Sequence, residues 1–281
     1  MVIRFFHEEC NLLALLVRNY QGLRRLRMLG AFFKIEFGYC LFLLGIRCTS
    51  AQLLGLSVHF FSYERYRSLF REIFVRKEYA FSGATKPVII DCGGNIGMSV
   101  LFFKEQNPDA EILVFEPDPA TFALLSRTIT ENKLAVQAEQ AALTSTSKPV
   151  ELLIPNHEKG SLGMTTMPAM ILSHTPATKI TVPGVMLSTF IDKPVDFLKI
   201  DVEGAELTIL QDLAQHKKLE FIKAMVVEFH YNPGAPENSL SEFIHILESH
   251  KFSFVAESLH IMPPYENYKG KGFHMLIYAY R

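Results

Sequence analysis

The stretch that decides the fold is Val88-Ile-Ile-Asp91-Cys-Gly93-Gly94-Asn95-Ile-Gly97. It opens with a short apolar run that ends in an acid, which is typical of a buried strand reaching the edge of a parallel sheet. The glycines that follow let the backbone bend sharply and approach a ligand closely, and they lead into a helix whose first N–H groups are free. The stretch therefore predicts a strand, a ligand-binding turn and a helix, in that order.

The spacing of the glycines separates two classes of cofactor. A dinucleotide fingerprint, GxGxxG, that began at Gly93 would need glycines where the chain has Asn95 and Met98. The chain has instead an acid two residues before a Gly-x-Asn-x-Gly core, which is typical of turns that bind the amino-acid end of S-adenosylmethionine. We predict that the cofactor turn consists of Asp91, Gly93, Gly94, Asn95 and Gly97.

A second acidic side chain, Glu116, ends the next predicted strand, 25 residues after Asp91. A carboxylate at that position offers two acceptor oxygens to the two hydroxyl donors of a ribose. Pro117 and Asp118 follow directly, and we assign both to the same cofactor site. A glycine turn can serve structure alone, and an acid at a strand end can be a solvated cap. The two motifs in this order and at this spacing favour one cofactor site.

Short apolar strands alternate with amphipathic helices from residue 86 onward. This repetition specifies an α/β fold with a parallel sheet, right-handed crossovers and helices on both faces. The last strand, 273–280, has no crossover helix before it, so we predict that it is antiparallel. Residues 142–194 interrupt the alternation, and we predict an excursion there with strands at 150–154 and 180–187. The remaining predicted strands are 88–91, 111–116, 135–140, 195–201, 224–229 and 252–255.

The beginning of the chain differs from the rest. Its apolar residues recur at mixed spacings of three and four, which predicts a helical N-terminal appendage over 1–77, followed by one large domain over 78–281. Residues 1–80 carry twelve Lys or Arg against six Asp or Glu, although the whole chain has a net charge of -1. Ordinary helical packing, a lid, a dimer contact and a peripheral contact with an anionic membrane remain open for this segment.

Composition limits the class of protein. The chain has 281 residues, 49% of them hydrophobic, which is enough for a sizeable core. Its four cysteines form no CxxC pair and have no histidines at zinc-ligand spacing, which fits a reducing cytoplasm. The apolar runs at 12–17 and 37–46 are shorter than the roughly 20 residues that a membrane-spanning helix needs. We expect a cytoplasmic protein without a transmembrane span.

Charged side chains also mark the ends of the fourth and fifth predicted strands of the sheet. Lys199 and Asp201 lie in an otherwise apolar strand, and Glu203 follows. Burying charges without a use is costly, and the tips of parallel strands line the ligand crevice. The next strand ends in Glu228-Phe-His230, so we predict Asp201, Glu203 and His230 as catalytic residues. The structural alternative pairs Lys199 with Asp201 or Glu228 and leaves Glu203 and Glu206 to favour a helix N-terminus.

Together these motifs resemble the FkbM-type methyltransferases. The resemblance extends from about residue 78 to 231 and is carried by Lys-Glu-Tyr-Ala-Phe at 77–81, the glycine turn, Phe-Glu-Pro-Asp-Pro at 115–119 and Phe-Leu-Lys-Ile-Asp-Val-Glu-Gly-Ala-Glu at 197–206. It implies a class I methyltransferase, with a Rossmann-like seven-stranded sheet, S-adenosyl-L-methionine as cofactor and methyl transfer to a hydroxyl of a sugar, glycan or secondary metabolite. It carries over Gly93, Asn95 and Gly97 as loop positions, Glu116 as the ribose acid, and Asp201 with Glu203 as crevice residues.

A hydroxyl acceptor must lose its proton as it is methylated. Asp201, Glu203 and His230 are the candidate bases, with a slight preference for Asp201. We predict no bound metal, although Asp201, Glu203 and Glu228 could instead hold a divalent ion that lowers the pKa of the hydroxyl. The fourth strand has no Asn-Pro-Pro-Tyr motif, so we expect no nucleic acid partner. A protein- or nucleic-acid-directed methyltransferase and a non-catalytic cofactor-binding member are the alternatives, and the oligomeric state is open.

Overall fold

The computed structural model describes residues 2–155, 163–168, 176–232, 237–258 and 273–281. The chain forms two compact units. The first unit comprises Met1–Ala80, Ile96–Gln106 and Leu124–Leu134, and the second comprises Phe81–Asn95, Asn107–Ala123 and Ala135–Arg281. The separate appendage predicted over 1–77 stays a prediction, since the first unit also draws on two later segments.

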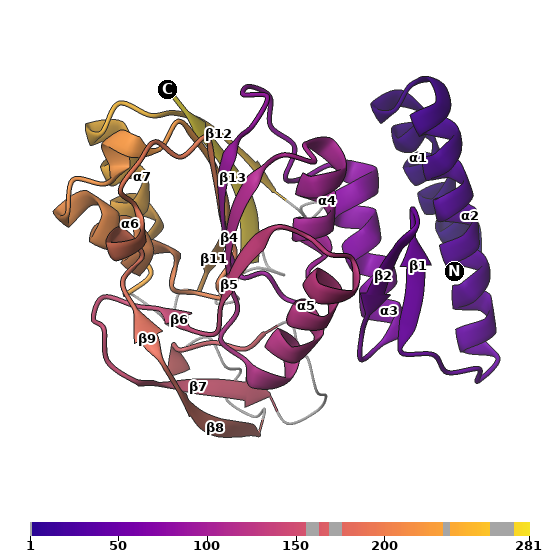
Figure 1. Ribbon diagram of the computed structural model, residues 1–281, viewed down its shortest axis with the longest axis horizontal. Coiled ribbons are helices and arrows are strands. Elements are labelled where there is room, and N and C mark those ends of the chain that lie inside the picture. The colour runs from indigo at the N-terminus through magenta and orange to yellow at the C-terminus, as the bar shows by residue number, and fades with distance from the viewer. Residues whose placement is uncertain (1, 156–162, 169–175, 233–236, 259–272) are drawn as a thin grey trace. The chain divides into compact units, whose positions relative to one another are not determined.

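A seven-stranded sheet forms the centre of the second unit, in the order β12-β13-β11-β10-β3-β4-β5 (Figure 1). All neighbours from β11 to β5 are parallel, whereas β13 is antiparallel to both β11 and β12. The predicted seven strands and the antiparallel last strand are therefore confirmed. The strand bounds are β3 Val88–Cys92, β4 Glu111–Phe115, β5 Val136–Glu139, β10 Phe197–Ile200, β11 Ala224–Tyr231, β12 Ser253–Ser258 and β13 Phe273–Tyr280.

The strand order reverses between β3 and β10, which pair in parallel with Asp91 beside Lys199 and Cys92 beside Ile200. From β3 the chain proceeds to β4 and β5 on one side, and from β10 to β11 on the other. Open α/β sheets bind ligands outside the carboxyl ends of their strands at such a switch point. The glycine turn follows β3 and Asp201 follows β10, so both lie at this position.

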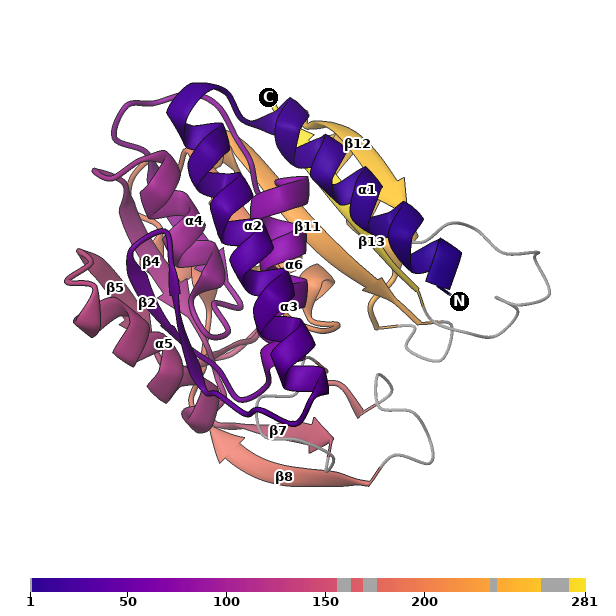
Figure 2. The same cartoon turned by 90° about the vertical axis from the view of Figure 1, so that its right-hand side faces the viewer.

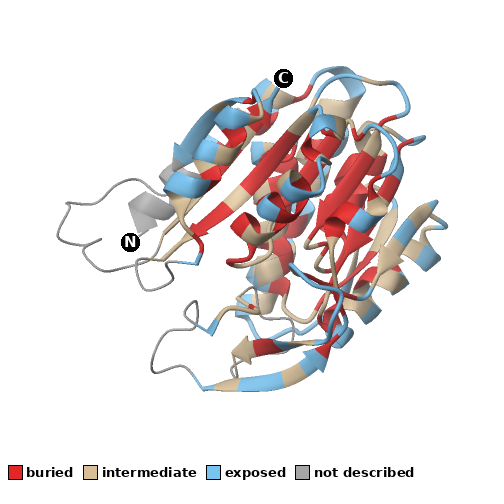
Figure 3. Ribbon diagram, turned by 90° about the vertical axis from the view of Figure 1, so that its left-hand side faces the viewer, coloured by how far each residue is buried: buried red, intermediate tan, exposed pale blue. Residues whose placement is uncertain are grey.

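Two helices cover one face of this sheet, α6 (Glu206–Gln215) and α7 (Leu240–Ser249). Their apolar side chains join those of β10, β11 and β13 in one core, in which the rings of Phe229 and Phe243 lie 5.0 Å apart. Figure 3 shows buried residues, in red, along the strands of the central sheet. Ser239 begins α7 as its N-cap and accepts a hydrogen bond from the Glu242 N–H. Burial of this apolar face positions the polar strand tips at the carboxyl edge.

The excursion predicted between residues 142 and 194 contains two small sheets. β7 (Val150–Pro155) pairs with β8 (Ala177–Val182) in antiparallel register, and β6 (Ala142–Leu143) pairs with β9 (Gly184–Val185) in parallel. The second predicted strand, 180–187, is therefore divided between β8 and β9, because Pro183 lacks the N–H that a continuous ladder needs. The short 3₁₀ helix η3 (Leu187–Phe190) follows, and a second one, η4 (Leu219–Phe221), lies between α6 and β11.

The first unit is mainly helical, but it also contains a β-hairpin that sequence reasoning missed. Strands β1 (Ser50–Leu53) and β2 (Leu56–His59) pair in antiparallel register around Leu54 and Gly55, which both have positive φ, 54° and 92°. Two left-handed residues are what a two-residue hairpin turn requires. The helices of this unit are α1 Val2–Asn19, α2 Gly22–Leu43, α3 Tyr63–Leu69, the π-helix η1 Phe70–Arg76, α4 Met98–Gln106 and the end of α5 Pro119–Glu131.

Polar contacts hold the first unit together at its centre. Arg67 and Arg71 both form ion pairs with Glu9 and Glu36, so two of the basic side chains of this segment are neutralised within the unit. Tyr20 donates from its hydroxyl to the Phe74 carbonyl over 2.7 Å. Among the helices of the described residues, none is long and apolar enough to cross a membrane.

Candidate active site

The glycine turn after β3 contacts the ends of β4 and β10, the two strands that flank β3. The N–H groups of Gly93 and Gly94 both donate to the Phe115 carbonyl at the end of β4, over 3.0 and 2.8 Å. Gly93 has a φ of 96°, and a Cβ added there would lie 1.9 Å from the Asp201 carbonyl oxygen. Only glycine fits this close approach between the turn and the end of β10.

Gly97 lies in the first unit and is also a close-contact position. Its φ is 92°, and an added Cβ would lie 3.1 Å from Leu125 and 3.3 Å from Thr128, both on α5. The Thr128 hydroxyl also donates to the Ile96 carbonyl over 3.1 Å. Helix packing thus accounts for this glycine in the structure, and its contact with a cofactor stays a prediction.

Glu116 is a buried carboxylate held by the backbone on both sides. Its Oε2 accepts the Asn95 N–H over 2.9 Å, and its Oε1 accepts the Asp118 N–H over 3.0 Å. Burial raises the pKa of Glu116 to about 7, although these two N–H donors favour the ionised form. Each oxygen keeps a further lone pair, so the side chain can still accept the two hydroxyls of a ribose. The donor and acceptor set therefore fits the ribose of S-adenosylmethionine.

Asp118 has a structural role that is visible in the second unit. Its carboxylate accepts hydrogen bonds from both the N–H and the hydroxyl of Thr121, over 2.8 and 2.7 Å. This is the arrangement of a helix N-cap, and it begins α5 directly after Pro117 and Asp118. The cofactor contacts predicted for these two residues stay predictions.

Lys199 is a buried cation that joins the glycine turn to β10. Its Nζ lies 2.6 Å from the Gly93 carbonyl oxygen, 3.1 Å from Asp91 Oδ1 and 3.6 Å from Asp201 Oδ2. Burial opposes its charge, but the Asp91 and Asp201 carboxylates raise its pKa above the ordinary value. The contact of Lys199 with Asp201 that the structural alternative predicted is therefore present. Asp91 is a second partner, which sequence reasoning missed.

His230 lies between carboxylates at the end of β11. Its Nδ1 lies 2.8 Å from Glu206 Oε1, and its Nε2 lies 3.3 Å from Glu203 Oε2. Burial opposes the positive charge, but Glu206 and Glu203 raise the pKa of His230 well above its ordinary value. The Asn238 amide donates to Glu206 Oε2 and to the His230 carbonyl, each over 2.9 Å. Glu206 and Asn238 thus orient the imidazole toward Glu203.

Glu203 has an uncommon backbone conformation. Its φ is 56°, and Gly204 next to it has a φ of 111°. A non-glycine residue in the left-handed region is strained, and such residues cluster at functional sites. Burial raises the pKa of Glu203 to about 7; His230 acts against this rise, and Asp201 and Glu206 add to it. The side chain is 31% exposed, so solvent and ligands reach its carboxylate.

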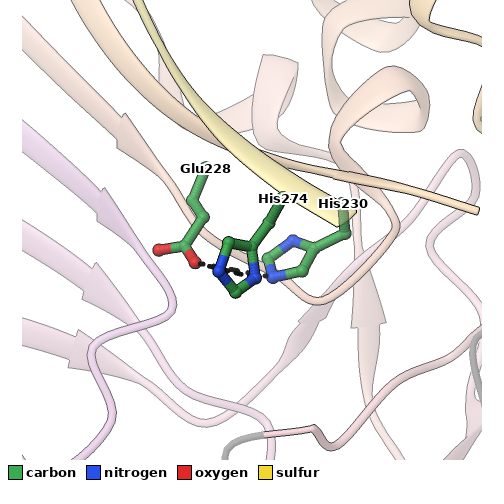
Figure 4. Close-up of side chains that lie close together, drawn as sticks. All are labelled: Glu228, His230 and His274. Atoms are coloured by element: carbon green, nitrogen blue, oxygen red, sulfur yellow. Dashed lines mark ion pairs between the residues drawn. The ribbon is translucent and has the colours of Figure 1, made fainter. Parts of the chain in front are cut away.

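Glu228, His230 and His274 lie together on β11 and β13 (Figure 4). His230 and His274 are direct partners in the antiparallel register, and Glu228 Oε1 lies 3.8 Å from His230 Nε2 and 3.7 Å from His274 Nδ1. In the part of the chain that the structure describes, two groups bring possible metal ligands within 4.8 Å of one another. They are Glu228 with His230 and His274, and Asp201 with Glu203 and His230. The predicted alternative trio of Asp201, Glu203 and Glu228 is not one of them.

Four of these residues were not predicted as site residues. Glu206 was interpreted as a helix-terminal charge, yet its side chain is fully buried and holds His230. Lys199 was interpreted as part of the ligand-crevice edge but not as a predicted site residue, and Asn238 carries no motif. His274 lies in the last strand, and its place beside His230 depends on a strand register that no local pattern encodes.

The strand order and the carboxyl-edge site together define a class I methyltransferase, which uses S-adenosylmethionine. Residues 91–254 match the family model described as the methyltransferase FkbM domain. This match covers more than half of the chain, so the chain belongs to the FkbM methyltransferase family. The resemblance inferred from the motifs is confirmed.

Two named sequence relatives agree with this assignment. "Methyltransferase 1" of Beauveria bassiana is 30% identical over 215 residues, covering 69% of this chain and 84% of the relative. The 31-O-demethyl-FK506 methyltransferase FkbM of Streptomyces tacrolimicus is 29% identical over 219 residues, covering 67% and 82%. A crystal structure of methyltransferase FkbM from Methylobacillus flagellatus is 15% identical with a TM-score of 0.47, covering 74% of this chain and 47% of that chain.

Proposed function

We propose that this methyltransferase transfers a methyl group to a hydroxyl oxygen of a small molecule or glycan, with Glu203 as the general base. The observation that carries the proposal is the contact of Glu203 with His230, which is itself held by Glu206 and Asn238. The name of the Streptomyces tacrolimicus relative, which specifies a 31-O-demethyl substrate, supports an oxygen acceptor.

The cofactor end of the site is formed by the glycine turn and Glu116. S-adenosylmethionine bound there would supply a sulfonium methyl group to an oxygen nucleophile. The Glu116 carboxylate would hold the ribose hydroxyls, and its hydrogen bonds from the Asn95 and Asp118 N–H groups fix its two oxygens in place. Such preorganisation reduces the cost of ordering the site on binding.

Glu203 suits the role of base better than Asp201, which was slightly preferred from the sequence. Asp201 lies 3.6 Å from the Lys199 ammonium, in the cluster that joins β10 to the glycine turn. The pKa of Glu203 is raised to about 7, close to the pH at which a base must both be ionised and accept a proton. The acceptor hydroxyl therefore gives its proton to Glu203, while His230 orients that carboxylate.

Glu228 and His274 extend the polar surface beside this base. The Glu228 side chain is 18% exposed and that of His274 is 34% exposed, so both can reach a ligand at the carboxyl edge. A carboxylate accepts hydrogen bonds from hydroxyl groups, and an imidazole can donate or accept them. This chemistry suits an acceptor with several hydroxyls, such as a sugar or a polyketide.

The experiment is turnover against a panel of hydroxylated sugars, glycans and polyketide-like compounds, with radiolabelled S-adenosylmethionine as methyl donor. The expected product carries its new methyl group on oxygen, as carbon-13 chemical shifts identify. Methylation of nitrogen or carbon, or labelling of protein or nucleic acid substrates instead of the panel, would contradict the proposal. Saturable cofactor binding with no turnover of any substrate class would favour the non-catalytic alternative.

A further inference from the structure

Helix α2 of the first unit, whose backbone is drawn in Figure 2, carries both buried and exposed apolar side chains. Met28, Phe32 and Ile35 are buried. The exposed side chains recur at helical spacing, with Gly30 also exposed between Leu26 and Phe33. This exposed stripe comprises Leu23 at 74% exposure, Leu26 at 65%, Phe33 at 57% and Phe37 at 65%, and Leu44 at 79% continues its register just after the helix. Exposed apolar rows of this length mark interaction sites.

The charges beside the exposed stripe have one sign. Arg27 and Lys34 lie one residue after Leu26 and Phe33, and both are exposed, as is Arg47 beyond the helix end. The one acid in the sequence of α2 is Glu36, which is occupied by ion pairs with Arg67 and Arg71 in the interior of the unit. The solvent-facing side of α2 is therefore both apolar and cationic.

We propose that the first unit binds an anionic membrane surface through the exposed stripe of α2, with the helix lying in the membrane interface. Its apolar side chains would enter the boundary between headgroups and acyl chains, and its cations would neutralise lipid phosphates or carboxylates. The helix lies on the membrane rather than across it, in keeping with the hydropathy of the described helices. The proposal is independent of the methyl acceptor.

A second copy of the chain fits this face less well. A symmetric dimer buries the same patch of both subunits, so Arg27 and Lys34 would meet a surface that carries the same cations. The exposed side of α2 offers no acid to pair with them, because Glu36 is committed to Arg67 and Arg71. Anionic headgroups remove this repulsion, so charge complementarity favours lipid.

The absence of tryptophan from the sequence permits a direct test. In Phe37→Trp the chain carries one indole on the exposed stripe, and in the control Tyr280→Trp it carries one at a position that is 52% exposed in the second unit. With vesicles of phosphatidylcholine and phosphatidylserine we expect a blue shift of the Phe37→Trp emission, weakened by salt, and no shift in the control. No shift of Phe37→Trp, or equal shifts in both variants, would overturn the proposal.

Flotation of the full chain with the same vesicles separates this face from general attraction to lipid. Arg27→Glu with Lys34→Glu should weaken the partition by roughly thirtyfold or more, at about fivefold for each lost cation. The control pair Lys86→Glu with Lys148→Glu makes the same change of net charge at exposed positions of the second unit. Equal losses of vesicle binding in the two double variants would show that the membrane contact lies elsewhere. A blue-shifted Phe37→Trp emission without vesicles, together with a dimer in sedimentation, would assign the face to a second copy.

Discussion

The ammonium group of Lys199 lies 2.6 Å from the carbonyl oxygen of Gly93 and connects the middle of β10 to the turn that follows β3. The same ammonium lies 3.1 Å from the buried carboxylate of Asp91. One side chain thus joins the two strands of the switch point at which the cofactor turn begins.

Replacing Lys199 by Met should destabilise the fold by about 3–5 kcal/mol, because it leaves the Asp91 carboxylate buried without its cation. Denaturant unfolding of the two proteins measures this difference. Lys223→Met is the matched control, since Lys223 is 62% exposed and pairs with Asp196 at the surface. That control should change the free energy of unfolding by only about 0–1 kcal/mol. Similar losses of stability in both variants would contradict the role of Lys199 in joining β3 to β10.

Replacing Gly93 by Ala should be costly for two reasons. The added Cβ would lie 1.9 Å from the Asp201 carbonyl oxygen, and the residue would keep a φ of 96°. We expect the free energy of unfolding to fall by about 2 kcal/mol or more, a sum of backbone strain and steric overlap. Gly30→Ala has open space around its Cβ and should raise the stability of α2 by about 0.5–1 kcal/mol. A Gly93→Ala variant with an unchanged free energy of unfolding would contradict the close approach of Gly93 to the Asp201 backbone.

Glu116→Gln should weaken the binding of S-adenosylmethionine about tenfold or more, a loss of about 1.4 kcal/mol, because one of two acceptor oxygens becomes a donor. Isothermal titration of the purified protein measures the affinity. Glu139→Gln, at the end of the neighbouring strand β5, is the control and should bind normally. Unchanged binding in Glu116→Gln would remove this residue from the ribose site.

The buried Glu116 should also make stability depend on pH. Its pKa rises from an ordinary 4.5 to about 7 on folding, so between these values the folded chain holds a proton that the unfolded chain has lost. Its contribution to stability is therefore greatest below about pH 4.5 and falls as the pH rises toward 7. Between these pH values the free energy of unfolding should fall more steeply with pH for the natural chain than for Glu116→Gln. Parallel curves would contradict the raised pKa.

The rate of methyl transfer should increase with pH through the pKa of Glu203, which is about 7, because a base acts only when it is ionised. In Glu203→Gln we expect kcat to fall by roughly 10²–10⁴-fold and this rising limb to disappear. The affinity for S-adenosylmethionine should stay unchanged. Glu248→Gln, at an exposed position of α7, is the control. A rising limb that persists in Glu203→Gln would assign the base to another group.

Much of the fold could be predicted because its signals are local. The apolar run at 88–91 predicted β3, and the run at 111–116 predicted β4. A missing crossover helix predicted the antiparallel last strand, and the spacing of Gly93, Asn95 and Gly97 separated the cofactor classes. The hairpin at 50–59 was missed because its sequence has apolar residues at spacings that a helix also shows, and only the positive φ of Leu54 and Gly55 distinguishes it.

The sequence by itself determined the order of the strands along the chain, the glycine turn and the acids that end the strands, because backbone freedom and hydrophobic period are properties of neighbouring residues. Only the tertiary structure decided which polar groups meet. The parallel register of β3 and β10 brings Asp91 beside Lys199, and the antiparallel register of β11 and β13 brings His230 beside His274. Register depends on the burial of whole sheet faces and on long-range pairing, and a shift of one residue would turn these side chains to the opposite face.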